Sequence, residues 1–259
     1  MRIFLLIGCL FAVLLSFGNA EEKEKPLTFF EVRTYQASEG KLDELHKRFR
    51  DHASKLLKKH EMTSIVHLEP VEEGSNSLTY ILGFHSQEQR DTNRAAFWDD
   101  EVWLKAFEKS EENGTLVDNV ESSFFTIADY SPKFYASSNA KQSEGEGQLF
   151  EIRTYTTNAG KLDDLDARFR DHTIALFAKH GMKNILYLHP AEGEKGYGTT
   201  LKYIIAHKDM DTRNASFKAF GKDPAWQAVK KNSEEEGKIL VEDGVVNAFY
   251  KASDYSPLK

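Results

Sequence analysis

The chain repeats itself, and this duplication constrains its fold more than any other feature. The segment GKLDELHKRFRDH at residues 40–52 returns as GKLDDLDARFRDH at residues 160–172, a shift of 160 − 40 = 120 positions. The repetition continues to the C-terminal end, where SDYSP at 253–257 matches ADYSP at 128–132. Because the two copies carry the same motifs in the same order, we expect two structural units of one fold.

Within each copy, the sequence pattern predicts the order strand, helix, strand, strand, helix, strand. In the first copy, apolar residues between Leu42 and Leu57 recur at spacings of three and four, which is typical of an amphipathic helix. In the second copy, DPAW predicts a helix that starts with Asp223 as N-cap and Pro224 at the first helical position. Runs rich in β-branched and aromatic residues predict the four strands of the first copy, at 28–36, 63–70, 78–85 and 120–130.

This element order is that of the ferredoxin-like unit, whose helices cover one face of a sheet and leave the other face uncovered. Two such units can cover each other. We therefore predict an α+β fold in which tandem ferredoxin-like (βαββαβ) units pack sheet to sheet. The predicted domains are residues 27–133 and 149–259. Residues 134–148 are mostly small and polar, which is typical of a linker.

The N-terminal segment, residues 1–20, has the arrangement of a secretory signal peptide. Arg2 precedes an apolar run, and small residues stand at Gly18 and Ala20. We expect cleavage near Ala20 and a secreted or periplasmic protein. The apolar run is shorter than the ~20 residues that a membrane-spanning helix needs, so no stable membrane span is predicted. Cys9, the single cysteine, lies in this segment, which leaves the mature protein without a disulfide.

The charge balance bears on the class of partner. The formal net charge of −7 becomes −8 when Arg2 is removed, and no long block of Lys and Arg occurs. Nucleic-acid binding needs such clusters to displace counterions. We therefore expect no nucleic-acid partner, whereas a small anionic ligand held by a few local arginines is compatible with this composition.

Both copies open with a strand that carries charge, FEVRTY at 30–35 and FEIRTY at 150–155. Alternate strand residues point to opposite faces, so the Glu, Arg and Tyr residues share one face and the apolar residues share the other. We assign the apolar face to the helices and the charged face to the space between the two sheets. The predicted ligand-binding residues are Glu31, Arg33, Tyr35, Glu151, Arg153 and Tyr155, joined by His67 and Tyr187 from the second strands.

Two interpretations of these charged side chains stay open. In the first, they form a structural ion-pair network that fixes the two halves, because buried charges must be paired. In the second, they line a ligand pocket, where an arginine binds an anionic or carbonyl oxygen and a Tyr or Glu handles a proton. His85 and His207, at the ends of the third strands, are further candidates for this space.

Motifs for metals and common cofactors are missing from the sequence. It has no HExxH motif, no cysteine pair and no dense cluster of His and carboxylate residues, so no metal site is predicted. No cofactor is predicted either, although haem stays open because one axial histidine leaves no spacing signature. We interpret His60 and His180 as helix caps and the charged residues at 48–52 and 168–172 as mainly solvated helix surface.

Several motifs in a fixed order resemble the NIPSNAP family, over nearly the whole chain after residue 20: FEVRTY or FEIRTY, GKLD, RFRDH, KHGM and DPAW. The resemblance implies a dimeric α/β barrel, here formed within one chain, in a superfamily shared with cofactor-free monooxygenases and haem proteins. It implies no settled catalytic function. Glu61 replaces the Gly of KHGM in the first copy, which predicts a changed turn there. The positions that match the family signature are Glu31, Arg33, Tyr35, Gly40, His60 and Met62, then Glu151, Arg153, Tyr155, Gly160, His180, Gly181 and Met182.

The leading hypothesis is an exported protein that binds a small organic ligand in the lumen between its two sheets. One alternative is a cofactor-independent oxygenase or isomerase-like enzyme that uses Tyr35 or Tyr155 with the paired Glu and Arg. The other is an interaction module whose lumen is closed by ion pairs. Further association into a homo-oligomer stays open in each case.

Overall fold

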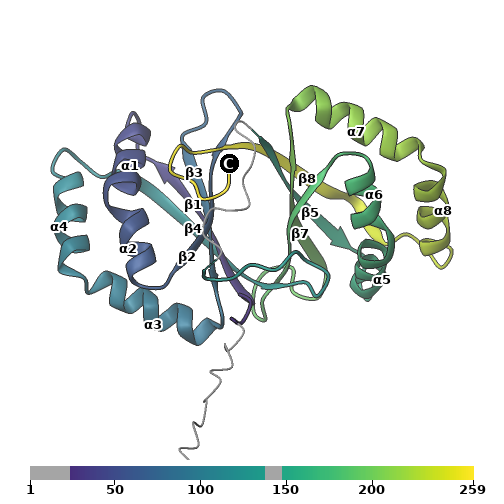
Figure 1. The fold of residues 1–259 in the computed structure, drawn as a ribbon, viewed down its shortest axis with the longest axis horizontal. Helices are drawn as coiled ribbons and strands as arrows, with labels where there is room; N and C mark the ends of the chain where they lie inside the picture. Colours follow the sequence, from purple (N-terminus) through teal and green to yellow (C-terminus); the bar gives the residue numbers. More distant parts are fainter. Residues whose placement is uncertain (1–23, 138–147) are drawn as a thin grey trace, which may run out of the picture.

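The computed structural model of the protein describes residues 24–137 and 148–259, so the expected signal peptide and most of the expected linker lie outside the described residues. Two units of the same construction lie side by side, with their helices outside and their strands in the middle (Figure 1). The first unit comprises β1 (Phe29–Ala37), α1 (Leu42–Arg48), η1 (Phe49–Ala53), α2 (Ser54–Lys59), β2 (Thr63–Pro70), β3 (Ser77–Phe84), α3 (Gln87–Trp98), α4 (Glu101–Ser110) and β4 (Val117–Ile127). The second comprises β5 (Leu149–Thr157), α5 (Leu162–Arg168), η2 (Phe169–Thr173), α6 (Ile174–Lys179), β6 (Lys183–Pro190), β7 (Thr200–His207), α7 (Met210–Lys222), α8 (Pro224–Ser233) and β8 (Leu240–Ala252).

The strands form one closed antiparallel barrel in the order β1-β3-β2-β8-β5-β7-β6-β4. Within each unit the order is that of a ferredoxin-like sheet. The units join at two seams, where Leu68 of β2 lies opposite Ala252 of β8 and Phe125 of β4 lies opposite Pro190 of β6. This arrangement confirms the predicted α+β fold of two tandem units packed as an internal pseudo-dimeric barrel.

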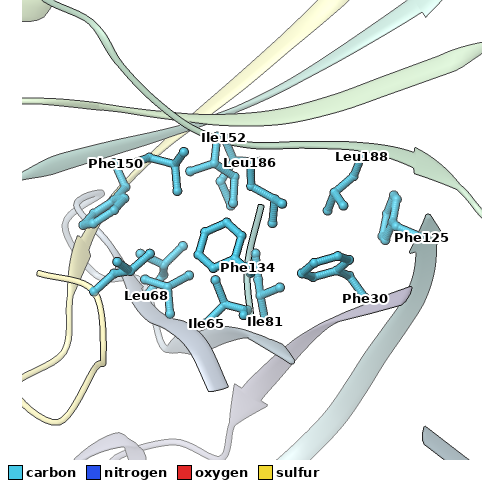
Figure 2. Close-up of a cluster of buried hydrophobic side chains, with 14 of the residues drawn as sticks. Phe30, Ile65, Leu68, Ile81, Phe125, Phe134, Phe150, Ile152, Leu186 and Leu188 are labelled. Atoms are coloured by element: carbon cyan, nitrogen blue, oxygen red, sulfur yellow. The ribbon is translucent and has the colours of Figure 1, made fainter. Parts of the chain in front are cut away.

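The barrel interior is a packed apolar core. Figure 2 shows side chains from both units meeting there, among them Phe30, Ile81, Ile152 and Leu188. Phe30 packs in this core with side chains of both units, whereas Glu31 bonds Arg90 of α3, so the apolar face of β1 lines the barrel and the Glu, Arg and Tyr face lies under the helices. The prediction that the charged face lines the lumen is wrong, and so is the prediction of a polar ligand site there. Apolar side chains line the interior, whereas helices α3 and α7 supply Arg90 and Arg213 to the carboxylates.

Phe134 also belongs to this core. It lies in the segment whose composition indicates a linker, yet the residue is only 5% exposed, and its ring packs at 6.5 Å, centroid to centroid, from Phe30. Its backbone oxygen accepts a 2.7 Å hydrogen bond from the amide of Leu27. The segment after β4 therefore closes the barrel before the chain continues toward β5.

Helix ends in the two units use the same contacts. Asp100 and Asp223 are the N-caps of α4 and α8, and the Asp223 carboxylate accepts a 2.9 Å hydrogen bond from the amide of Ala225, as DPAW predicts. His60 and His180, the C-cap residues of α2 and α6, place their Nε2 atoms 2.7 and 2.8 Å from those same carboxylates. Each histidine therefore links the end of one helix to the start of another.

The turn after α2 departs from its prediction. Glu61 has a φ of 53°, and Gly181 at the equivalent position has a φ of 77°. The amide of the following residue bonds back to the carbonyl of Leu57 in one unit and Phe177 in the other, at 2.9 Å in both. The turn is thus unchanged, and Glu61 adopts the left-handed conformation that favours glycine.

The repeated DYSP motif connects the units. The Ser256 hydroxyl of the second unit accepts a 2.9 Å hydrogen bond from the amide of His67, and Ser131 of the first unit accepts one of 3.0 Å from the amide of Tyr187. An ion pair also joins the two units here: Asp254 of the second unit lies 2.7 Å from an Nη atom of Arg50 in the first. Each unit therefore uses its last residues to cover the other.

Candidate functional site

Glu31 is the centre of a buried ion network between β1 and α3. Its Oε1 atom accepts hydrogen bonds from Arg33 (2.6 Å), Ser122 (2.8 Å) and Arg90 Nη2 (2.9 Å), and its Oε2 atom accepts one from Arg90 Nε (2.9 Å). Burial alone would raise the pKa of Glu31, but the hydrogen bonds from Arg90 and the charge of Arg33 outweigh it and lower that pKa to about 2. A fully paired carboxylate of this kind is suited to holding α3 on the sheet.

The second unit repeats the network around Glu151. Arg213 of α7 binds this carboxylate through Nη2 (2.7 Å) and Nε (2.9 Å), and Arg153 binds it at 2.5 Å. His207, whose place in the sequence makes it a candidate for the lumen, instead has its Nε2 atom 3.2 Å from Glu151. Burial would raise the pKa of Glu151, yet these partners lower it to about 2.

The strand tyrosines extend each network. Arg33 donates to the Tyr35 hydroxyl at 3.4 Å, and Tyr80 donates to the same oxygen at 3.0 Å. Burial opposes ionisation of Tyr35, but the Arg33 guanidinium lowers its pKa. Arg153 donates to the Tyr155 hydroxyl at 3.1 Å. Both tyrosine oxygens therefore face a guanidinium, in a layer between sheet and helices.

His67 lies on the helical face of β2 without a hydrogen-bond partner for its ring. It is 0% exposed, and both ring nitrogens are buried and unbonded within the described part of the chain. The ring packs against Tyr255 at 5.1 Å and against Phe49 and Tyr80 at 5.6 Å, centroid to centroid. Burial, followed by the charge of His46, lowers the pKa of His67 to about 3, so its imidazole is neutral at neutral pH.

A cavity of about 480 Å³ opens beside this imidazole. Ser54 and Ser64 also line it, and their hydroxyl oxygens are likewise buried with no hydrogen-bond partner among the described residues. The register of β2 shifts between Ser64 and Val66, and Ser64 and His67, three residues apart, line the same cavity. We call this cavity the His67 pocket; it is lined by Leu27, Ser54, Lys58, Glu61, Met62, Thr63, Ser64, His67, His85, Gln89, Ala136, Tyr255 and Pro257.

The second unit uses the equivalent positions differently. Tyr187 stands where His67 stands in the first unit, and its hydroxyl bonds Asn184 Oδ1 at 2.5 Å. Asn184, equivalent to Ser64, donates to the carbonyl of Ile174 at 3.1 Å. At these positions the second unit therefore satisfies its polar side chains internally, whereas the first leaves His67, Ser54 and Ser64 unbonded beside a cavity.

The predicted site residues thus separate into groups. His67 lines the His67 pocket, Tyr187 is hydrogen-bonded in the sheet layer, and the other strand residues belong to the two networks. Sequence reasoning did not identify Ser54 and Ser64, although a position-by-position comparison of the copies offers a signal, since Ile174 and Asn184 replace them. A polar ligand can bond the His67 pocket through an imidazole and two hydroxyls.

The described residues contain neither a cluster of metal ligands nor a membrane-spanning helix. Within 24–137 and 148–259, no group of three or more His, Cys, Asp or Glu side chains is placed to hold a metal ion. His67 and His85 are the imidazoles of the His67 pocket. No helix in these same ranges combines the length and apolar character needed to cross a membrane.

Comparison with solved structures finds the same architecture. A proposed monooxygenase from Fusobacterium nucleatum subsp. nucleatum matches with a TM-score of 0.55 at 8% identity, over 88% of this chain and 93% of that one. A second, from Lactobacillus acidophilus NCFM, matches with a TM-score of 0.52 at 7% identity, over 87% and 94%. A NIPSNAP-like domain protein from Burkholderia xenovorans is 16% identical over 42% of this chain and 91% of its own, with a TM-score of 0.38.

No curated protein matches the chain. The model of the NIPSNAP family does, at residues 30–132 and again at 150–257, which together make up most of the sequence. Each matched region coincides with one ferredoxin-like unit of the barrel. The chain therefore belongs to the NIPSNAP family, as a tandem pair of its domains.

Proposed function

We propose that this protein binds a small, uncharged organic molecule carrying a hydroxyl or carbonyl group in the His67 pocket. The observation that carries the proposal is the convergence of three buried, unbonded polar side chains, His67, Ser54 and Ser64, on one cavity. A buried polar group without a partner costs roughly 1–3 kcal/mol. A ligand that bonds these groups recovers that free energy on binding.

The chemistry of the pocket favours a neutral ligand. A neutral imidazole offers one donor and one acceptor, and each serine hydroxyl offers both, so a hydroxyl or carbonyl group can be bonded from several directions. Leu27, Met62 and Pro257 supply apolar contact surface. The cavity volume of about 480 Å³ falls in the range of small-molecule sites, ≈ 300–1,000 Å³.

A comparison of wild-type and filled pockets tests the proposal. The variant Ser54→Ile/Ser64→Asn/His67→Tyr installs the residues of the second unit, which should fill the cavity and satisfy its polar groups. Thermal unfolding is measured with phenol and with cyclohexanone as neutral probes. We expect a probe-dependent rise in Tm for the wild type and none for the filled variant.

Ile174→Ser is the matched control, because it changes the equivalent position in the second unit and leaves the hydrogen bond between Tyr187 and Asn184 in place. The imidazole nitrogens of His67 give a direct readout, since their NMR signals should move when a probe bonds the ring. An equal Tm rise in wild type and filled variant, or unchanged His67 signals, contradicts the proposal.

The two Glu–Arg networks, in this proposal, serve the fold rather than a reaction. Each carboxylate already accepts bonds from two guanidiniums, which supports the structural interpretation of these ion pairs. We also propose that the protein works after export, with a mature N-terminus at Glu21, on the strength of the signal-like residues 1–20. Mass spectrometry of the native protein tests this, and an intact Met1 contradicts it.

A further inference from the structure

The second unit has a cavity of its own, of about 360 Å³, between its helices and the strands β5 and β8. Its walls are aromatic. Phe169 of η2, Phe177 of α6, Phe220 of α7 and Trp226 of α8 all contribute to the lining, and the Tyr155 ring joins them from β5. Such walls suit a flat apolar ring, because offset and edge-on ring contacts add to the burial of apolar surface.

More cationic than anionic side chains line this aromatic cavity. Arg168, Lys230 and Lys238 line it together with one carboxylate, that of Glu234. Arg168 binds Glu234 through Nη1 at 3.0 Å, while its Nε atom is buried with no hydrogen-bond partner among the residues described. Within the described ranges, no carboxylate forms an ion pair with Lys230 or Lys238. The cavity therefore holds a surplus of cationic groups.

The first unit carries aromatic rings at two of the equivalent positions. Phe107 stands where Lys230 stands and lies 5.0 Å beneath the Arg48 guanidinium, the counterpart of Arg168. Trp98, at the position of Gly221, packs its ring 5.7 Å from that of Phe107. A ring-to-lysine change and a ring-to-glycine change thus distinguish the second unit, and the lysine, Lys230, lines the cavity.

We propose that this cavity, the Arg168 pocket, binds a small aromatic carboxylate. The ring lies among the aromatic side chains, and the carboxylate accepts hydrogen bonds from Lys230 and from Arg168. This class fits better than a free phosphate, which gains nothing from the apolar walls, and better than a neutral ring, which cannot form a charge-assisted hydrogen bond with Lys230. The site differs in place and ligand charge from the His67 pocket.

Calorimetric titration of the full chain with benzoate tests the inference, with benzamide as a neutral compound of nearly the same shape. We expect one benzoate per chain, weaker binding as salt is added, and affinity for benzamide about tenfold lower, since the charge-assisted hydrogen bonds are lost. Lys230→Phe installs the residue of the first unit and should abolish benzoate binding. Lys230→Gln keeps the cavity and should weaken binding about tenfold.

Lys231→Gln is the control, because Lys231 is an exposed neighbour on α8 that does not line the cavity. It should bind benzoate as the wild type does. Absence of benzoate binding to the wild type, equal affinity for benzamide, or undiminished binding by Lys230→Gln overturns the inference. The variant with the filled His67 pocket should still bind benzoate as the wild type does. The proposals for the two pockets are therefore tested independently of each other.

Discussion

The Tyr130 hydroxyl, in the first unit, donates a 2.6 Å hydrogen bond to the carboxylate of Asp166 in the second unit. The reciprocal contact differs in charge, because Tyr255 of the second unit lies 2.9 Å from the Nδ1 atom of His46. The Asp166 oxygen is also 3.0 Å from the Nε2 atom of His189. The tyrosine of each DYSP segment therefore contacts the other unit, but Tyr130 bonds a carboxylate whereas Tyr255 lies against an imidazole.

This difference predicts unequal effects of removing the two hydroxyls. Tyr130→Phe should lower the free energy of unfolding by about 1.5–3 kcal/mol, the range for a hydrogen bond to a charged group, and Tyr255→Phe by only about 0.5–1.5 kcal/mol. Urea unfolding of both variants provides the measurement. Equal losses, or a larger loss for Tyr255→Phe, would mean that the Asp166 contact does not carry the interface as described.

The face of the opening strand was the main point that sequence reasoning could not decide. Alternation in FEVRTY correctly separates Phe30 from Glu31, but both faces of this sheet are buried, so hydrophobicity does not show which face the helices cover. The deciding partners are Arg90 and Arg213, which lie 59 and 62 residues along the chain from the carboxylates they bind. No local periodicity signals such a pairing.

The element order and the pairing of two units were predictable, because a duplicated βαββαβ pattern leaves one sheet face uncovered in each unit. The candidate site, in contrast, could be predicted only in part. His67 was identified, yet strict strand alternation places Ser64 on the opposite face from it, and the bulge in β2 reverses this. The charge pattern predicts a solvated Arg48, but α4 covers it, and it is 4% exposed and paired with Glu111.

A single unit should not remain a folded monomer. Residues 24–137 alone expose the apolar barrel face, including Phe30 and Phe125, and leave both seam strands unpaired. We expect this fragment to form a homodimer, which restores the barrel, or to aggregate. Sedimentation velocity of the fragment beside the full chain decides the outcome, and a soluble, fully folded monomer would contradict the sheet-to-sheet account of stability.

The turn after α2 gives a prediction with a built-in control. Glu61 holds a left-handed backbone at a φ of 53°, which strains a residue with a side chain. Glu61→Gly should relieve this strain and raise the free energy of unfolding by about 0.5 kcal/mol, after the extra entropy of glycine in the unfolded chain is subtracted. Gly181→Glu makes the reverse change and should cost about 1 kcal/mol. The two shifts, measured by urea unfolding, must have opposite signs.

The acid stability of the protein should depend on Glu31 and Glu151. Although burial opposes ionisation, their arginine partners lower each pKa from 4.5 to about 2 in the folded state. Each carboxyl then binds fewer protons folded than unfolded, so its contribution, roughly 3 kcal/mol, is present above the unfolded pKa and is lost as the pH falls toward 2. Glu31→Gln leaves the buried Arg33 without a carboxylate and Arg90 with only the exposed Asp91, and it should cost roughly 3 kcal/mol at neutral pH.

Because Gln does not titrate, that deficit should shrink on acidification. Urea unfolding from about pH 7 down to about pH 3 follows it, and the wild type should lose stability more steeply than the variant below about pH 5. Asp91→Asn is the control, since Asp91 binds Arg90 from an exposed position, with its side chain 57% accessible, and does not touch Glu31. Parallel curves for the wild type and Glu31→Gln would show that the Glu31 carboxylate is not held by its two arginines as the structure places it.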